Sequence, residues 1–314
     1  MKLLVPRSFE LTLGDPTRDT IVFYDPTAPI ADADVDVEVF VAAGNTPTQL
    51  ADSAKRLRHL RWVQSLAAGT EGILAAGFDQ SVVITSGRSL HDATVSEHAL
   101  ALILSGLRSL PALGRYQQKH EWAFEIGGEQ REGPSEPRKS LTGARVTIWG
   151  FGSIASTLAP LLRAMGAEVV GVAHTAGDRA GFPVIGLDQV DARLAVTDIL
   201  FAIIPGSPEN RRIIDARRIG LLPKRAWIVN VGRGSTLDEA ALIDALRSGR
   251  LAGAALDVFE QEPLPADSPL WDAPNLIITP HSAGGRPRGA AQLIARNLDA
   301  LHRGAGLENV VARS

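Results

Sequence analysis

Short apolar runs alternate with amphipathic stretches along most of this chain. In the first ninety residues, the runs predict strands over residues 1–6, 35–41, 62–66 and 82–85, with a helix over residues 50–61. Strands and helices that alternate in this way form a parallel sheet covered by helices. The stretch over residues 10–18 breaks the pattern, so the order of the early strands stays open.

A longer helix is predicted over residues 93–110, where apolar residues recur at spacings of three and four and Pro111 is expected to end the helix. Its apolar residues cover more than one face, which exceeds what a surface helix needs. We therefore expect this helix to cross between two domains and to contribute to a two-fold homodimer. The polar stretch over residues 125–139, rich in glycine and proline, is expected to be an exposed loop.

The same alternation continues over residues 141–283. Further strands are predicted over residues 144–149, 168–173, 199–205, 227–231, 253–258 and 276–280, with helices over residues 155–166 and 238–248. The last thirty residues, rich in alanine and leucine, predict a helix that packs back on the first domain.

A glycine turn follows the strand over residues 144–149, and a helix and a second strand come after it. This order, completed within about thirty residues, is typical of a dinucleotide site. Gly150 permits the tight turn, Gly152 lets the backbone approach a pyrophosphate, and Ala155 takes the place of a third glycine. The pyrophosphate would lie at the helix N-terminus, which Ser153 and Ile154 begin.

Composition narrows the classes of protein. The chain has 314 residues, enough for two domains. Its net charge of −3 does not favour nucleic acid or an anionic membrane as a partner. It has no cysteine, so disulfides, thiolate nucleophiles and cysteine metal sites are excluded, and we expect no metal. The N-terminal apolar run is too short for a signal peptide, and none can span a bilayer, so we expect a soluble, cytoplasmic protein.

Three polar residues follow three predicted strands of the second half: Arg233, Glu262 and His281. In open α/β sheets, chemistry collects at the carboxyl ends of strands. The planar fork of Arg233 can hold a substrate carboxylate and polarise the adjacent carbonyl. His281 can give a proton to the carbonyl oxygen as hydride reaches C2, with Glu262 on its other ring nitrogen favouring the charged imidazole. Each residue alone has a structural interpretation, and only their joint appearance favours catalysis.

At these residues the chain resembles the D-isomer-specific 2-hydroxyacid dehydrogenase family, from about residue 62 to residue 285. The similarity rests on the glycine turn and on residues 229–234, residues 255–259 with Glu262-Pro263, and residues 269–271 leading to residues 279–281. The resemblance implies two doubly wound α/β domains. A Rossmann NAD(P)-binding domain over residues 93–285 would be inserted into a flavodoxin-like substrate domain formed by residues 1–92 and 286–314.

The resemblance also implies an enzyme similar to glyoxylate/hydroxypyruvate reductases. It would transfer hydride between NAD(P)H and the C2 carbonyl of a small 2-keto acid to give a D-2-hydroxy acid. Arg233, Glu262 and His281 would be its catalytic trio. Further contacts are implied at Ala68 and Gly69 (substrate carboxylate), Thr94 and Asp257 (nicotinamide), Pro205 (adenosine side) and Val231. Asp257 has an alternative interpretation as a strand-end cap.

One departure from the family bears on the cofactor. The acid expected at the end of the second nucleotide-domain strand is replaced by Ala173, which His174 and Thr175 follow. Without that acid, and with Arg179 nearby, NADP is favoured over NAD; Asp178 is expected in a loop turned away. The alternative is an NAD enzyme that lacks this contact.

Other functions remain open on the same scaffold. Formate and phosphite dehydrogenases share the family, and dimeric corepressors that sense nucleotides share the trio. A structural protein with a vestigial site is a third alternative. The side chain of the keto acid is not indicated either, since Trp122, Phe124 and Trp271 are only candidates to line the cleft. The chain ends soon after the last helix, so no regulatory domain is expected.

Overall fold

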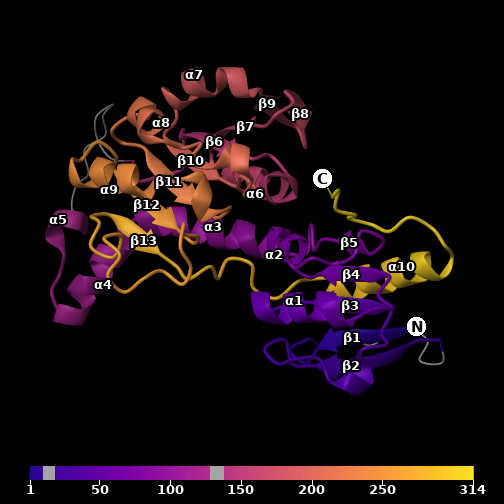
Figure 1. The fold of residues 1–314 in the computed structure, drawn as a ribbon. Coiled ribbons are helices and arrows are strands. Elements are labelled where there is room, and N and C mark those ends of the chain that lie inside the picture. The colour runs from indigo at the N-terminus through magenta and orange to yellow at the C-terminus, as the bar shows by residue number, and fades with distance from the viewer. Residues whose placement is uncertain (10–17, 128–137, 314) are drawn as a thin grey trace. The chain divides into compact units, whose positions relative to one another are not determined.

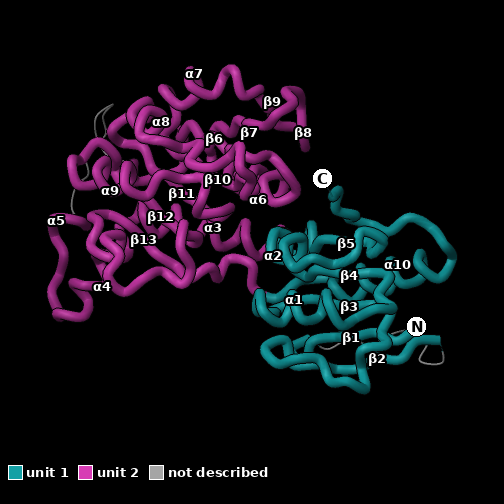
Figure 2. Tube along the Cα trace, in the orientation of Figure 1, with its two compact units in different colours: residues 1–91, 286–314 teal, residues 92–285 magenta. Residues whose placement is uncertain are grey.

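A computed structural model describes residues 1–9, 18–127 and 138–313. These form two compact units, one made of residues 1–91 and 286–314 and the other of residues 92–285 (Figure 2). Residues 10–17 of the irregular stretch and residues 128–137 of the predicted loop lie outside the described residues. Within the described part, no helix is long and apolar enough to cross a membrane.

The first unit contains a sheet of five parallel strands in the order β2-β1-β3-β4-β5 (Figure 1). This order is that of flavodoxin-like domains and confirms the predicted fold. The strands are β1 (Lys2–Pro6), β2 (Thr20–Tyr24), β3 (Val39–Ala42), β4 (Trp62–Ser65) and β5 (Val83–Thr85). The helices are α1 (Pro47–Arg56), α2 (Glu71–Ala75) and α10 (Ala290–His302).

Alternation along these strands sends side chains to two cores. Leu3 and Val39 point to the face covered by α10, where Ile294 is fully buried. Leu4 and Phe40 point to the opposite face and pack with residues of α1. The C-terminal segment of the chain therefore completes the first unit, as the sequence predicts.

The second unit contains an eight-stranded sheet in the order β13-β12-β11-β10-β6-β7-β9-β8. Neighbouring strands are parallel except β8 and β9, which are antiparallel. Counted from β6 and leaving β8 aside, the first six strands stand in the order 3-2-1-4-5-6, the predicted Rossmann arrangement. The strands are β6 (Arg145–Trp149), β7 (Glu168–Val172), β8 (Gly177–Arg179), β9 (Phe182–Ile185), β10 (Ile199–Ala202), β11 (Trp227–Asn230), β12 (Gly253–Leu256) and β13 (Leu276–Ile278).

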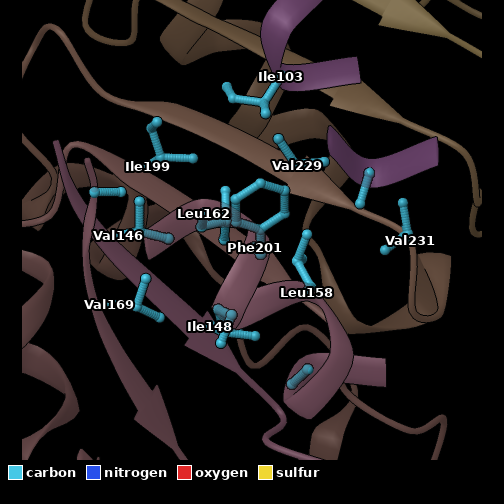
Figure 3. Packing of buried hydrophobic residues seen from close by; sticks show 14 of the residues in the cluster. Ile103, Val146, Ile148, Leu158, Leu162, Val169, Ile199, Phe201, Val229 and Val231 are labelled. Atoms are coloured by element: carbon cyan, nitrogen blue, oxygen red, sulfur yellow. The ribbon is translucent and has the colours of Figure 1, made fainter. Parts of the chain in front are cut away.

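Helices cover both faces of this sheet. Side chains of α3 (Asp92–Leu107) and α6 (Ser153–Ala164) pack on one face, and those of α7 (Val190–Leu194), α8 (Ala216–Leu221) and α9 (Glu239–Arg247) pack on the other. Phe201 lies in the core of the first face, among Val146 and Leu162 (Figure 3). Burying a side chain of this size contributes about 2–3 kcal/mol, so this layer holds the sheet firmly.

Two shorter helices, α4 (Leu110–Lys119) and α5 (Phe124–Gly127), follow α3. The expectation that Pro111 ends the long helix is wrong, because α3 ends at Leu107 and Pro111 stands in the first turn of α4. Proline is tolerated there because the first turn of a helix has no internal partner for its N–H groups. The interruption itself lies at Ser109, whose φ is +55°.

Other element bounds also differ from the sequence-based prediction. Helix α1 begins at Pro47, with Thr46 as its cap, and ends at Arg56 instead of Arg61. Strand β3 begins at Val39 because Val35 follows a 3₁₀ turn and has helical dihedral angles. Strands β2, β8 and β9 have no counterpart in the prediction, and α5 occupies the start of the predicted loop. Four 3₁₀ helices appear in the described residues, at Asp32–Asp34, Leu187–Gln189, Pro208–Asn210 and Gly234–Thr236.

Candidate active site

The carboxyl ends of the central strands stand in register across the second unit. The last residues of β7, β6, β10, β11, β12 and β13 pair in sequence across the sheet: Val172, Trp149, Ala202, Asn230, Leu256 and Ile278. The predicted residues of this unit, apart from Thr94 on α3, follow these ends within a few positions. The fold therefore gathers them along one edge of the sheet.

The glycine turn after β6 requires glycine at its first position. Gly150 has a φ of +96°, and a Cβ there would lie 2.2 Å from the carbonyl oxygen of Ile203. Its N–H donates to the carbonyl of Val172 at 3.0 Å, which ties the turn to the end of β7. Both the left-handed dihedral and the close approach exclude a side chain, so this turn has the tight geometry that the sequence predicts.

The start of α6 has the features of an anion cradle. Gly152 is its N-cap residue and no side chain caps the helix. A Cβ built on Gly152 would meet no atom within 4 Å, so the backbone here is open to a ligand. Ala155 is fully buried where helix and strand meet, as expected for the third position of the motif. The uncapped N–H groups and the helix dipole therefore fit a dinucleotide pyrophosphate.

Arg233 stands in the turn after β11, and side chains on either side of it in the sequence hold this turn by hydrogen bonds. The amide of Asn230 and the hydroxyl of Thr236 both donate to the carbonyl of Arg233, at 3.2 and 2.6 Å. A Cβ on Gly234 would lie 1.9 Å from the carbonyl carbon of Phe259, so the turn lies directly against the segment that follows β12. These contacts fix the backbone of Arg233, and Nη1 of its guanidinium donates to the carbonyl of Gly232 at 2.8 Å.

Glu262 and His281 come together at this edge. Nδ1 of His281 lies 2.6 Å from Oε2 of Glu262, and the backbone N–H of Phe259 donates to Oε1 at 2.9 Å. A carboxylate can only accept, so Nδ1 carries the hydrogen of this bond. No described residue forms a recorded hydrogen bond to Nε2 of His281, and half of this side chain is exposed.

Asp257 anchors the loop that carries His281. Its carbonyl accepts from the N–H of His281 at 2.8 Å, and its two carboxylate oxygens accept from Ser282 and Ala283 at 2.9 and 3.0 Å. The hydroxyl of Thr279 donates to Oδ1 at 2.6 Å. The carboxylate is only 1% exposed, and its hydrogen bonds are those of a strand-end cap. These contacts fit the strand-end cap, and the contact with the nicotinamide stays a prediction.

The end of β7 carries the predicted cofactor-selecting residues. His174 and Thr175 are exposed, and Ala173 is half-buried. The guanidinium of Arg179 donates to the carbonyl of Phe151 in the glycine turn at 3.0 Å and to that of Thr175 at 2.9 Å. Asp178 lies in β8 and not in a loop, and its carboxylate accepts from the N–H of Gly181. The arginine therefore points toward the dinucleotide turn, and the acid caps the hairpin.

The remaining predicted residues lie in both units. Pro205 and Val231 follow β10 and β11 at the same edge, and the hydroxyl of Thr94 donates to the carbonyl of Gly284 at 2.7 Å. Ala68 and Gly69 belong to the first unit, in the loop after β4. The ring of His91 holds that loop by a 2.8 Å hydrogen bond to the carbonyl of Leu66, which accepts.

Sequence reasoning missed three polar residues on α3 that contact the predicted site. They are Asp92, Ser96 and His98, whose side chains bond to Ser153, Ile154 and Thr279. The signal was present as polar residues spaced by four in a helix that is otherwise apolar.

Comparison with known proteins agrees with this geometry. A family model described as the NAD binding domain of D-isomer specific 2-hydroxyacid dehydrogenase matches residues 100–283. The chain belongs to the D-isomer-specific 2-hydroxyacid dehydrogenase family. It is an NAD(P)-dependent oxidoreductase that interconverts 2-keto and 2-hydroxy acids.

Three similar proteins illustrate the range of this family. D-3-phosphoglycerate dehydrogenase of Methanocaldococcus jannaschii is 28% identical over 290 residues, which cover 90% of this chain; the chain spans about half (52%) of that relative's length. A solved family member from Aeromonas salmonicida has a TM-score of 0.83 and 31% identity, with 99% of this chain and 98% of that chain covered. An NADPH-dependent glyoxylate/hydroxypyruvate reductase of Sinorhizobium meliloti, solved with NADP and sulfate, has a TM-score of 0.80 and 27% identity, with 99% and 97% covered.

Proposed function

We propose that this dehydrogenase reduces the C2 carbonyl of a small 2-keto acid to a D-2-hydroxy acid with Arg233, Glu262 and His281 as its catalytic trio. The observation that carries the proposal is the pair formed by His281 and Glu262, 2.6 Å apart at the same sheet edge as the glycine turn. Because Glu262 occupies Nδ1, Nε2 is the ring atom that meets the substrate oxygen.

Each member of the trio has a separate task. The bound nicotinamide supplies the hydride. Arg233 holds the substrate carboxylate with its planar fork and polarises the neighbouring carbonyl. His281 gives the proton on Nε2 to the carbonyl oxygen and takes it back in the oxidative direction. Glu262 keeps the ring in one orientation and stabilises the imidazolium while it is charged.

We propose that the backbone N–H groups of Ala68 and Gly69 bind the substrate carboxylate, which requires their loop to keep its shape. Three internal bonds support that shape: Ser65 Oγ accepts from the N–H of Ala67 at 3.1 Å, the N–H of Gly87 donates to the carbonyl of Ala67 at 2.8 Å, and His91 binds the loop as described. In this proposal the first unit is the substrate domain and the second unit is the nucleotide-binding domain.

For the cofactor, we propose a preference for NADP over NAD. Ala173 leaves no carboxylate at the end of β7 to repel a 2′-phosphate, and Arg179 already points toward the glycine turn. The exposed side chain of His174 adds a second donor at this strand end. The similar reductase of Sinorhizobium meliloti is NADPH-dependent, which supports this choice.

For the substrate, the same similarity supports glyoxylate or hydroxypyruvate. The test is a panel of glyoxylate, hydroxypyruvate, pyruvate, a bulkier 2-keto acid, formate and phosphite, each assayed with NADPH and NADH. We expect the fastest turnover with one of the first two acids and NADPH. If the protein binds NADPH but turns over none of these compounds, the proposed reductase activity is wrong and the nucleotide-sensing alternative is favoured.

We also propose that the protein is a cytoplasmic homodimer. Large apolar side chains are exposed on the second unit at Leu110, Trp122 and Phe124, which suits a surface covered by a second copy. The absence of cysteine suits a reducing compartment. Sedimentation at micromolar concentration tests the dimer, and a monomeric mass would contradict it. Fractionation of the source cells tests the compartment.

A further inference from the structure

The first turns of α3 hold the glycine turn through one pair of side chains. The hydroxyl of Ser153 donates to the carboxylate of Asp92 at 2.9 Å, and the hydroxyl of Ser96 donates to the carbonyl of Ile154 at 3.2 Å. Asp92 and Ser96 are four residues apart, so they lie one above the other on the same face of the helix. This face of α3 supports the start of α6.

A second pair on α3 holds the loop around His281. Thr94 donates to the carbonyl of Gly284 at 2.7 Å, and Nε2 of His98 lies 3.0 Å from the hydroxyl of Thr279. These two are again four residues apart and share a face. One helix of the second unit therefore contacts both the dinucleotide turn and both sides of the His281 loop.

The direction of the bond at His98 follows from its neighbours. Thr279 has a single hydroxyl hydrogen, which it gives to Oδ1 of Asp257 at 2.6 Å. Its oxygen can then only accept from His98, so Nε2 of His98 carries a hydrogen. The same nitrogen lies 3.3 Å from Oδ1 of Asp257. His98 is 24% exposed and Asp257 is 1% exposed, so the imidazole lies between solvent and a buried carboxylate.

That carboxylate determines the backbone of the catalytic loop. Its two oxygens accept from the N–H groups of Ser282 and Ala283, and the backbone carbonyl of Asp257 accepts from the N–H of His281. His281 has a φ of +49°, a left-handed conformation that costs a non-glycine residue about 1–3 kcal/mol. Such a conformation persists only where surrounding bonds impose it. Any freedom of Asp257 would therefore reach the imidazole of His281.

We propose that His98 is a positioning residue for His281, acting through Thr279 and Asp257. By donating to Thr279 and lying beside Oδ1, it keeps the Asp257 carboxylate aimed at the N–H groups of Ser282 and Ala283, and so keeps Nε2 of His281 where the substrate oxygen is protonated. This inference rests on the proposed function, in which His281 is the proton donor. It predicts an effect on the chemical step and none on either binding step.

The test compares His98→Leu, His98→Gln and a control, His59→Gln, at an exposed histidine of the first unit. In His98→Leu, kcat should fall about 10-fold to 100-fold, since a misplacement of about 1 Å costs that much. The KM for the keto acid and the Kd for NADPH should stay within about twofold of wild type. Glutamine restores an N–H at similar reach, so His98→Gln should recover most of kcat. The control should equal wild type.

A second measurement needs neither substrate nor cofactor. The imidazole signal of His281 is assigned in the NMR spectrum by its loss in His281→Ala. It should move or broaden in His98→Leu and in Thr279→Val, return in His98→Gln, and stay unchanged in His59→Gln. Thr279→Val keeps the shape of the side chain and removes the hydroxyl that joins His98 to Asp257. It replaces His98→Leu in the test if the leucine variant does not fold.

The outcomes separate this inference from the proposed function. If wild-type protein turns over a keto acid but kcat in His98→Leu stays within about twofold, the positioning role is wrong. Equal losses of kcat in the leucine and glutamine variants, matched by equal losses of Tm, would also overturn it, because they indicate a structural role only. If wild-type protein has no turnover, the proposed function fails, and the His281 signal alone still decides whether His98 positions the ring.

Discussion

Oε2 of Glu262 lies 2.6 Å from Nδ1 of His281, while Oε1 of the same carboxylate accepts from the backbone N–H of Phe259. Both oxygens are therefore engaged, and the carboxylate is fixed before any substrate arrives. An imidazole held in this way on one nitrogen presents the other in a single direction. The relationship assigns the orienting role to Glu262 and the proton-transfer role to His281 in the proposed reaction.

Replacing Glu262 by glutamine should slow the chemical step without weakening cofactor binding. Glutamine keeps the size of the side chain but removes the negative charge that stabilises the imidazolium. We expect kcat to fall by about 100-fold, the lower range for general acid–base catalysis, with an unchanged Kd for NADPH. Steady-state kinetics and NADPH fluorescence titration measure the two quantities. An unchanged kcat would show that Glu262 does not assist His281.

Replacing Arg233 by alanine should remove the carboxylate grip. Loss of one partner of a bound charge pair costs about 2–5 kcal/mol, so kcat/KM should fall by roughly 30-fold to several thousand-fold. Arg233→Lys should recover only part of this, because an ammonium cannot bind a carboxylate through two parallel bonds. Arg247→Ala, at an exposed position of α9, is the matched control. Near-normal kcat/KM in Arg233→Ala would refute the assignment.

Replacing Ala173 by aspartate should shift the cofactor preference toward NADH. The new carboxylate repels the 2′-phosphate across partly screened solvent, so NADPH binding should weaken by no more than about 3 kcal/mol. Ala173→Asn introduces the same shape without charge and separates repulsion from steric effects. The Kd values for NADPH and NADH report the result. A wild-type preference for NADH of tenfold or more would show that the basic side chains near β7 do not select NADP.

Replacing Glu239 by glutamine should stabilise the protein at neutral pH. Burial raises the pKa of this carboxyl, and the nearby Glu260 adds to the increase, although the N–H of Glu260 also donates to Glu239. Because the folded state holds the proton more tightly than the unfolded state, stability is highest below the ordinary pKa of glutamate and falls as pH rises through the raised value. The gain in Tm should therefore be larger at pH 7 than at pH 4.

The control for this prediction is Glu308, a carboxyl whose pKa is shifted in the opposite direction. Arg296 hydrogen-bonds to Glu308 and lowers the pKa of its carboxyl, so the ionised form stabilises the fold above the ordinary pKa and that contribution is lost as pH falls. Glu308→Gln should lower Tm slightly at pH 7 or leave it unchanged, because the pair is half exposed. If both glutamine variants behave alike, burial of Glu239 is not what governs its ionisation.

Much of the second unit could be predicted from local sequence. The β-branched strand before Gly150, the glycine turn and the amphipathic helix after it each carry their own signal within a few residues. Helix α9 was placed to within a residue because Asp238 caps it, accepting from the N–H of Ala241. The polar residues after β11, β12 and β13 were found because strand ends are identifiable and parallel strands share one edge.

The parts that could not be predicted depend on contacts across the chain. Strand β2 contains the apolar residues Ile21, Val22 and Phe23, but it lies at the edge of its sheet and only Tyr24 is buried, so its place depends on pairing with β1. The function of Asp257 as an anchor depends on N–H groups more than twenty positions away. His98 stands in an apolar helix, and its significance appears only when α3 lies against the loop after β13.

The absence of a side chain at Gly234 has a consequence for variation in this enzyme. Its Cα hydrogen fills the space between the turn of Arg233 and the segment that leads from Phe259 to Glu262. In the proposed reaction these two turns carry Arg233, which binds the carboxylate, and Glu262, which orients His281, and only the Cα hydrogen of Gly234 separates them at this point. Any larger residue must push them apart. In a saturation library selected for turnover, position 234 should return glycine alone.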